Sequence, residues 1–176
     1  EFKVPNTSKR VDFLITGYDE EGKENAVIIE LKQWTECEKT DLKNLVFAYV
    51  GGRKRNLSHP SYQAYSYAQR IKNFNQTVQD KPVYLYPCAY CHNYEEQWKN
   101  EIEDQRYEEI IKDAPLFLSH DRLKLRRFIK KYIRKPDKGE ILYAIDNGKI
   151  RPSIELQDAI SKLLHGNKEF NRIDEQ

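Results

Sequence analysis

The chain has 176 residues, of which 39% are hydrophobic and 33% charged, and its formal net charge is +2. This balance suits one soluble globular domain and excludes a disordered chain, while so small a net charge does not by itself indicate a nucleic-acid partner. No apolar run approaches the roughly 20 residues that cross a bilayer, so we expect no membrane association.

The first forty residues predict a β-hairpin. Residues 10–17 have the alternation of a strand, and the apolar, β-branched residues 26–31 predict a buried strand after a polar turn. The hairpin therefore places Asp12 on one strand and Glu30 and Lys32 on the other.

The rest of the chain mixes strand and helix patterns. In chain order we predict a strand over 45–50, a basic loop over 53–55, a helix over 60–78, a strand over 83–91, an acidic helix over 94–111, a short strand over 116–118, a basic helix over 121–134 and, after an N-cap at Ser153, a last helix over 154–164. This order indicates an α/β fold with a central mixed β-sheet flanked by helices, followed by a mainly helical C-terminal part.

The spacing of three charged residues points to phosphodiester chemistry. Glu30 and Lys32 are two apart on a strand, so they share one face, and the hairpin can bring Asp12 beside Glu30. Two adjacent carboxylates repel each other unless a cation such as Mg²⁺ or Mn²⁺ lies between them. Lys32 could then orient a water and offset charge in the transition state. The alternative is a solvated strand pair beside a turn residue.

A further motif stands on the predicted helix, where Gln63 and Tyr67 are four residues apart and so share one face. Together, Val11-Asp12, Ile28-Ile29-Glu30-Leu31-Lys32 and Gln63-Ala64-Tyr65-Ser66-Tyr67 resemble the signature of the RecB-like branch of the PD-(D/E)XK nuclease superfamily. The resemblance implies a restriction-endonuclease-like core and Mg²⁺-dependent hydrolysis of DNA. It implies catalytic roles for Asp12, Glu30, Lys32, Gln63 and Tyr67, with Mg²⁺ or Mn²⁺ bound by Asp12, Glu30 and the backbone carbonyl of Leu31.

A wider resemblance covers nearly the whole chain. Residues 5–10, 59–63 and 139–143 are similar to the N-terminal region of uncharacterised bacterial proteins in which a nuclease-like domain precedes a P-loop, Schlafen-like helicase/ATPase domain. This implies a nuclease core over 1–135 and a helical extension over 136–176, whose last residues, 173–176, lead into that ATPase. The absence of methionine also predicts a piece of a longer protein. Many RecB-like nucleases carry another acidic or histidine ligand upstream, where this chain has only eleven residues.

Candidate contacts to DNA come from basic segments. Phosphate contacts are predicted for Arg53, Lys54, Arg55, His59, Lys124, Arg127, Lys130 and Lys131. Tyr62 and Tyr65 are candidates for stacking on unpaired bases. The alternatives are solvated surface charges and, for His59, a helix N-cap.

The cysteines suggest two competing sites. Cys88-Ala89-Tyr90-Cys91-His92 matches a haem-attachment pattern. We expect no haem, because no secretory signal is present and Cys88 and Cys91 would face opposite sides of a strand. A zinc site including Cys37 is a weaker alternative to buried, apolar cysteines. The odd number of cysteines fits a reducing cytoplasm.

The sequence thus predicts a Mg²⁺-dependent deoxyribonuclease coupled to an adjoining helicase/ATPase domain. One alternative is a catalytically inactive nucleic-acid-binding or regulatory module on the same fold. Another is a structural interaction domain for the ATPase.

Overall fold

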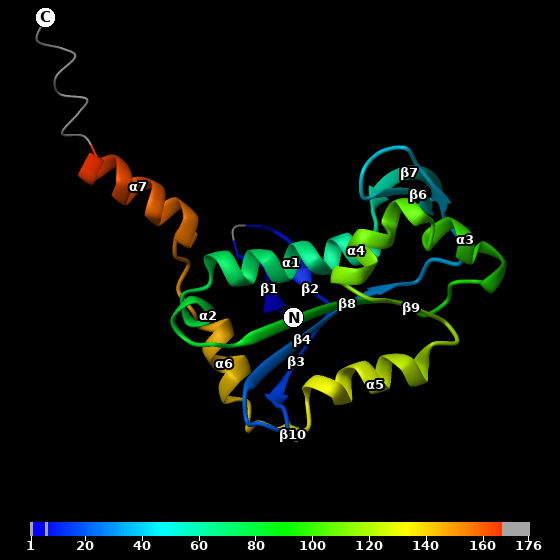
Figure 1. Cartoon of the computed structure of the whole chain (residues 1–176). Helices are drawn as coiled ribbons and strands as arrows, with labels where there is room; N and C mark the ends of the chain where they lie inside the picture. The colour runs from blue at the N-terminus through cyan, green and yellow to red at the C-terminus, as the bar shows by residue number, and fades with distance from the viewer. Residues whose placement is uncertain (1, 6, 167–176) are drawn as a thin grey trace, which may run out of the picture.

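The computed structural model describes residues 2–5 and 7–166, and its centre is a five-stranded mixed sheet (Figure 1). The strand order is β10 (Lys135–Pro136), β3 (Phe13–Tyr18), β4 (Glu24–Lys32), β8 (Tyr84–Cys91) and β9 (Leu116–Leu118). β3 and β4 are antiparallel, whereas β4, β8 and β9 are parallel to one another. The predicted α/β class with a central mixed sheet is confirmed.

Helices cover both faces of this sheet, α1 (Pro60–Phe74) on one side and α5 (Arg122–Tyr132) on the other (Figure 1). Alternate β4 residues face the two layers: Ala26 and Ile28 pack in the cluster with α1, while Val27 and Ile29 pack in the cluster with α5. A strand covered on both faces has to be apolar along its length, which explains the continuous run in β4.

The strand predicted over 10–17 is interrupted at Asp12. β2 (Arg10–Val11) pairs with β1 (Phe2–Lys3), and β3 then pairs with β4. At the break, the Asp12 carboxylate accepts a hydrogen bond of 2.8 Å from the backbone N–H of Leu31. The side chain is therefore tied to the end of β4.

The strand predicted over 45–50 is confirmed as β6 (Leu45–Val50), but it lies in a separate sheet between β5 (Glu38–Lys39) and β7 (Arg53–Ser58). The loop predicted over 53–55 is wrong, because these residues begin β7. Gly51 and Gly52 both have positive φ, +62° and +78°, which is the conformation of a two-residue hairpin turn. The turn sets the register that pairs Val50 with Arg53.

Two predicted helices are shorter than expected. The helix predicted over 60–78 ends at Phe74, because Asn75 is extended and its side chain caps α2 (Gln76–Asp80) by accepting from the Val78 N–H. The acidic helix predicted over 94–111 is wrong as one element. It is divided into η1 (Glu96–Trp98), α3 (Lys99–Ile102), η2 (Gln105–Tyr107) and α4 (Glu108–Asp113). Asp104 causes one break by capping η2 with its carboxylate.

The C-terminal part contains α6 (Glu140–Asp146) and α7 (Ile154–Gly166), and the N-cap predicted at Ser153 accepts from the Leu156 N–H. Ile141 and Ile145 of α6 belong to the core cluster on the α1 side of the sheet. The domain boundary predicted between residues 135 and 136 falls within β10. Residues 173–176, predicted to lead into an ATPase domain, lie outside the described residues. In the described part of the chain, no helix has both the length and the apolar character needed to cross a bilayer.

Candidate active site

Glu30 and Lys32 emerge together near the end of β4, on the face covered by α1. Glu30 is only 3% exposed. The Lys32 Nζ lies 2.5 Å from the Glu30 Oε1 in a largely buried ion pair. The period of two predicted for a strand therefore places both charges on one face.

Helix α1 supplies the other two residues of this cluster. The Gln63 Oε1 accepts from the Lys32 Nζ at 3.1 Å, and the Gln63 Nε2 donates to the Glu30 Oε1 at 2.6 Å. The same nitrogen lies 2.7 Å from the hydroxyl oxygen of Tyr67, one helical turn away. Gln63 thus bonds to both members of the ion pair and to Tyr67. The four-residue spacing predicted that Gln63 and Tyr67 share this helix face.

Asp12 reaches the same end of β4 from the neighbouring strand. The antiparallel pairing of β3 and β4 ends at Phe13 and Ile29. Just beyond it, the Asp12 carboxylate accepts from the N–H of Leu31, the residue after Glu30. Unlike Glu30, Asp12 is exposed. The structure brings together all four charged or amide groups that the sequence singled out.

Burial dominates the electrostatics of this cluster. It raises the pKa of Glu30, the Lys32 ammonium opposes that rise, and the Asp12 carboxylate adds to it. The pKa of Tyr67 is also raised, by burial and by the nearby Glu30. The Glu30 Oε2 is buried and has no hydrogen-bond partner among the described residues, so this carboxylate keeps an unused acceptor.

The donor set fits a hard cation that keeps several waters. Mg²⁺ is usually held by one or two carboxylates rather than by a complete protein cage. Asp12 and the unpaired oxygen of Glu30 provide two carboxylates, and Leu31, directly after Glu30, donates its backbone N–H to Asp12. Within the described ranges, no group of three or more His, Cys, Asp or Glu side chains is arranged to hold a metal. Any further ligand would be a backbone carbonyl or water.

Lys32 also lines an open cleft of about 410 Å³. Its walls include Leu31, Trp34, Tyr49 and Val50, so it lies between the end of β4 and the tip of the β6–β7 hairpin. The Lys32 Nζ is 5.5 Å from the centre of the Trp34 ring. Lys32 thus borders both the charged cluster and this cleft, with its side chain 16% exposed. Trp34 and Tyr49 were missed in the sequence, although an aromatic residue two positions after Lys32 was a usable signal.

The predicted phosphate contacts are divided between two places. Arg53, Lys54 and Arg55 are exposed on β7, and Lys54 pairs with Glu38. The basic residues of α5 lie on the opposite layer of the sheet from the α1 layer (Figure 1). The structure therefore does not bring Lys124, Arg127, Lys130 and Lys131 to the face occupied by Glu30 and Lys32.

His59 is a buried helix cap, which excludes the predicted phosphate contact. It is 0% exposed, its Nδ1 accepts from the Ser61 N–H at 3.2 Å, and its Nε2 lies 2.9 Å from the Ile102 carbonyl oxygen. Its ring stacks on Tyr107 with 4.6 Å between centroids. Burial lowers its pKa to about 4. The N-cap alternative is confirmed.

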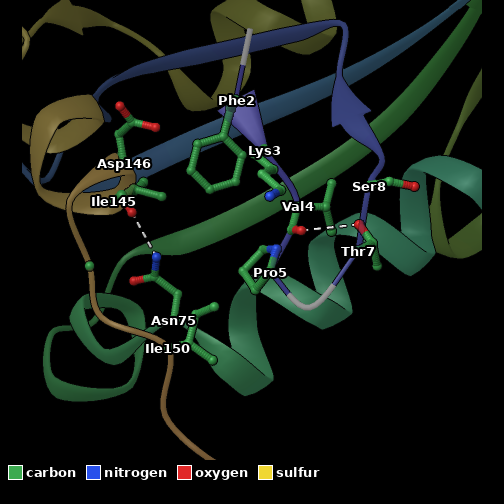
Figure 2. A pocket seen from close by; sticks show the side chains of 11 residues that line it. Phe2, Lys3, Val4, Pro5, Thr7, Ser8, Asn75, Ile145, Asp146 and Ile150 are labelled. Atoms are coloured by element: carbon green, nitrogen blue, oxygen red, sulfur yellow. Dashed lines mark hydrogen bonds between the residues drawn. The ribbon is translucent and has the colours of Figure 1, made fainter.

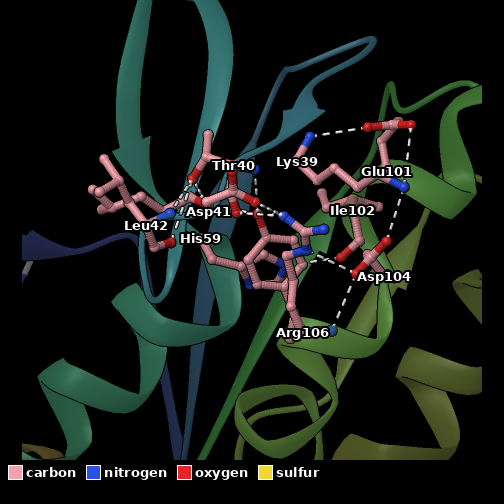
Figure 3. Close-up of polar contacts among 11 residues, drawn as sticks. Lys39, Thr40, Asp41, Leu42, His59, Glu101, Ile102, Asp104 and Arg106 are labelled. Atoms are coloured by element: carbon pink, nitrogen blue, oxygen red, sulfur yellow. Dashed lines mark hydrogen bonds and ion pairs between the residues drawn. The ribbon is translucent and has the colours of Figure 1, made fainter.

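Figure 3 shows His59 beside a surface network of charged residues. Asp104 pairs with Lys39 at 2.9 Å and with Arg106 at 2.9 Å, and Arg106 also reaches Asp41 at 3.1 Å. These pairs lower the pKa of Asp104 and balance one another's charge. The network holds the loop after β5 against η2.

The three cysteines are buried in two of the hydrophobic clusters, and Cys91 lies beside Lys32 on the neighbouring strand. Cys88 packs on the α5 side of the sheet, whereas Cys37 and Cys91 belong to another hydrophobic cluster. Cys88 and Cys91 thus face opposite sides, as predicted. All three thiols are buried and free.

A second cavity, of about 650 Å³, lies between the N-terminal segment and the end of α6 (Figure 2). Phe2, Asn75 and Ile145 are among its lining residues, and the Asn75 amide donates to the Ile145 carbonyl oxygen at 2.7 Å. None of the residues that line it was predicted to belong to a site.

Comparisons with protein-family models, with curated proteins and with solved structures found no match to this chain.

Proposed function

We propose that this chain is a Mg²⁺-dependent nuclease domain that hydrolyses DNA phosphodiesters, on a restriction-endonuclease-like core. One observation carries the proposal. Among the described residues, the buried Glu30 carboxylate has one oxygen without a hydrogen-bond partner while Lys32 binds the other, and the exposed Asp12 carboxylate is bound to the next residue, Leu31. Burying an ionised group is costly unless it is paired or binds a cation.

Each residue has a physical task in this reaction. A Mg²⁺ ion held by Asp12 and Glu30 would act as a Lewis acid on a phosphate oxygen and lower the pKa of a bound water. The Lys32 ammonium, at the cleft, offsets negative charge that develops on the phosphate and orients the attacking water. Gln63 positions the side chains of Lys32 and Glu30 by hydrogen bonds to both, and Tyr67 in turn positions Gln63.

The proposal includes an adjoining P-loop helicase/ATPase domain beyond residue 176, as the resemblance implies. Such a domain would deliver DNA to the cleft. The substrate contacts proposed on this side of the molecule are Arg53 and Arg55, which are exposed on the hairpin.

One observation favours the alternative, a catalytically inactive nucleic-acid-binding or regulatory module. Lys32 already compensates the charge of Glu30 at 2.5 Å, so the pair is neutral without a metal. A domain of this kind would bind DNA in a salt-sensitive manner without turnover.

The deciding experiment measures cleavage of labelled DNA by the purified protein with Mg²⁺ or Mn²⁺. We expect cleavage that is lost with EDTA and falls at least 100-fold in Glu30→Gln and Lys32→Met. Glu21→Gln, in an exposed pair with Lys23, is the matched control and should cleave like the wild type. Mn²⁺ should raise the melting temperature of the wild type but not of Glu30→Gln. Cleavage that survives Lys32→Met would refute the proposal, and binding without turnover would support the alternative.

A further inference from the structure

The cleft beside Lys32 is lined in part by aromatic and apolar side chains. Tyr49 is 61% exposed and Val50 is 40% exposed, and both lie at the tip of the β6–β7 hairpin. Trp34, two residues after the end of β4, forms another part of the lining. Aromatic and apolar groups beside polar ones in a cleft, next to a candidate active site, form a surface on which a ligand can bind.

Aromatic side chains of this kind offer flat faces to bases. Stacking is available only to bases that have left a duplex, since paired bases already stack on their neighbours along the helix. Tyr49 is free to stack because it projects from a hairpin tip and is mostly exposed. Trp34 is partly buried against the neighbouring core cluster, so its ring is held in place.

The charges around the cleft favour stacking over phosphate attraction as the main source of affinity. Lys32 lines the cleft, and Arg53 lies directly across from Val50 at the hairpin tip, where it is exposed. Glu36 also lines the cleft and opposes these two cations. A ligand held here therefore needs more than negative charge.

We propose that this cleft binds an unpaired nucleic-acid strand, with bases stacked on Trp34 and Tyr49 and a backbone phosphate directed toward Lys32. The substrate of the site is then single-stranded DNA or a frayed end, not an intact duplex. The inference that this strand is cut rests on the proposed nuclease function, whereas the inference that it binds does not.

The chain has two tryptophans, so Trp98→Phe leaves Trp34 as the single tryptophan reporter. In EDTA, where no metal-dependent cleavage can occur, this protein is titrated with an oligothymidylate and with a blunt duplex of equal length. We expect the single strand to quench Trp34 fluorescence and to bind at least tenfold more tightly than the duplex. Tyr49→Ala, in the same background, should weaken that binding by about tenfold.

The matched control is Tyr143→Ala, which removes a tyrosine that is 70% exposed on α6. It should bind like its parent. Because Tyr49 is so exposed, its removal should not affect folding, which thermal unfolding checks directly. The loss caused by Tyr49→Ala should also persist at high salt, unlike a loss of phosphate contacts.

Equal affinity for duplex and single strand, an unchanged affinity in Tyr49→Ala, or no quenching by either DNA would overturn the inference. The two proposals fail separately. Quenching that depends on Tyr49, without any cleavage, would support the binding cleft and refute the proposed nuclease function. Cleavage of duplex DNA that depends on Lys32 but is unchanged in Tyr49→Ala would support the nuclease function and refute the binding cleft.

Discussion

The buried ion pair between Glu30 and Lys32 should respond strongly to the loss of its cation. Lys32→Met keeps an unbranched apolar side chain, one atom shorter than lysine, and removes the ammonium, which lies 2.5 Å from the Glu30 Oε1. The Glu30 side chain is only 4% exposed, so water cannot replace the lost partner. Gln63 alone would then hold the carboxylate, at 2.6 Å.

The expected loss of stability is about 3 kcal/mol, at the lower end of what breaking a buried ion pair costs, because Gln63 remains bound. Urea unfolding followed by circular dichroism measures it. With a slope of about 2 kcal/mol per molar urea, the midpoint should fall by about 1.5 M. The matched control is Lys23→Met, which breaks an exposed pair with Glu21 of the same length and should leave the midpoint unchanged.

The loss of stability caused by Lys32→Met should also depend on pH. Burial raises the pKa of Glu30 above its ordinary 4.5, so the folded protein holds this proton more tightly than the unfolded chain does. The contribution of Glu30 to stability therefore falls as the pH rises from 4.5 through the folded pKa. Removing Lys32 raises that pKa further, and the deficit of Lys32→Met should shrink as the pH is lowered toward 4.5.

A double-mutant cycle with Glu30→Gln isolates the pair. Once the carboxylate is neutral, Lys32→Met should cost much less than it does in the wild type. The stabilising role of the ion pair is refuted if Lys32→Met lowers the urea midpoint no more than Lys23→Met does. A coupling free energy near zero between Glu30 and Lys32 would refute it as well.

Three further predictions follow from other buried groups. Because the pKa of His59 is lowered from 6.5 to about 4, wild type should lose about 3 kcal/mol of stability between pH 6.5 and 4. His59→Asn, which can still cap the helix, should lack this part of the acid loss in urea unfolding, and equal losses in both proteins would contradict the assignment. Gly17→Ala should lower the free energy of unfolding by about 2 kcal/mol, because a Cβ there would lie 2.5 Å from the Lys135 carbonyl oxygen. An unchanged urea midpoint would show that β10 can move away from this Cβ at no cost in stability. Burial raises the pKa of Cys37 to about 11 and that of Cys88 to about 12, so neither thiol should react with a disulfide reagent at pH 8 until urea unfolds the chain, and rapid native labelling would argue against their burial.

Local patterns in the sequence were sufficient for the elements that carry the candidate site. The apolar run in β4 and the helical spacing in α1 predicted a strand and a helix at the observed places. The period of two put Glu30 and Lys32 on one face, and the period near four put Gln63 and Tyr67 on another. The two repeats therefore decided which side chains share a face on β4 and on α1, and the packing of α1 on β4 then joined them by hydrogen bonds.

Elements whose structure depends on distant partners could not be read in this way. Arg53, Lys54 and Arg55 look like a basic loop because no apolar periodicity marks them, yet pairing with β6 makes them a strand. The acidic segment over 94–111 has helical composition, but the Asp104 cap divides it. From the sequence, His59 was a candidate phosphate contact, but the Tyr107 ring and the Ile102 carbonyl oxygen bury it in the folded chain.

By itself, then, the sequence determined which residue types repeat on which face, because backbone geometry fixes the periods of strands and helices. Only the tertiary structure decided which faces meet. It set α1 over Glu30 and Lys32, placed the basic residues of α5 on the far side of the sheet, and brought Tyr49 to the cleft beside Lys32. Those choices depend on packing between segments far apart in the chain, which no local repeat encodes.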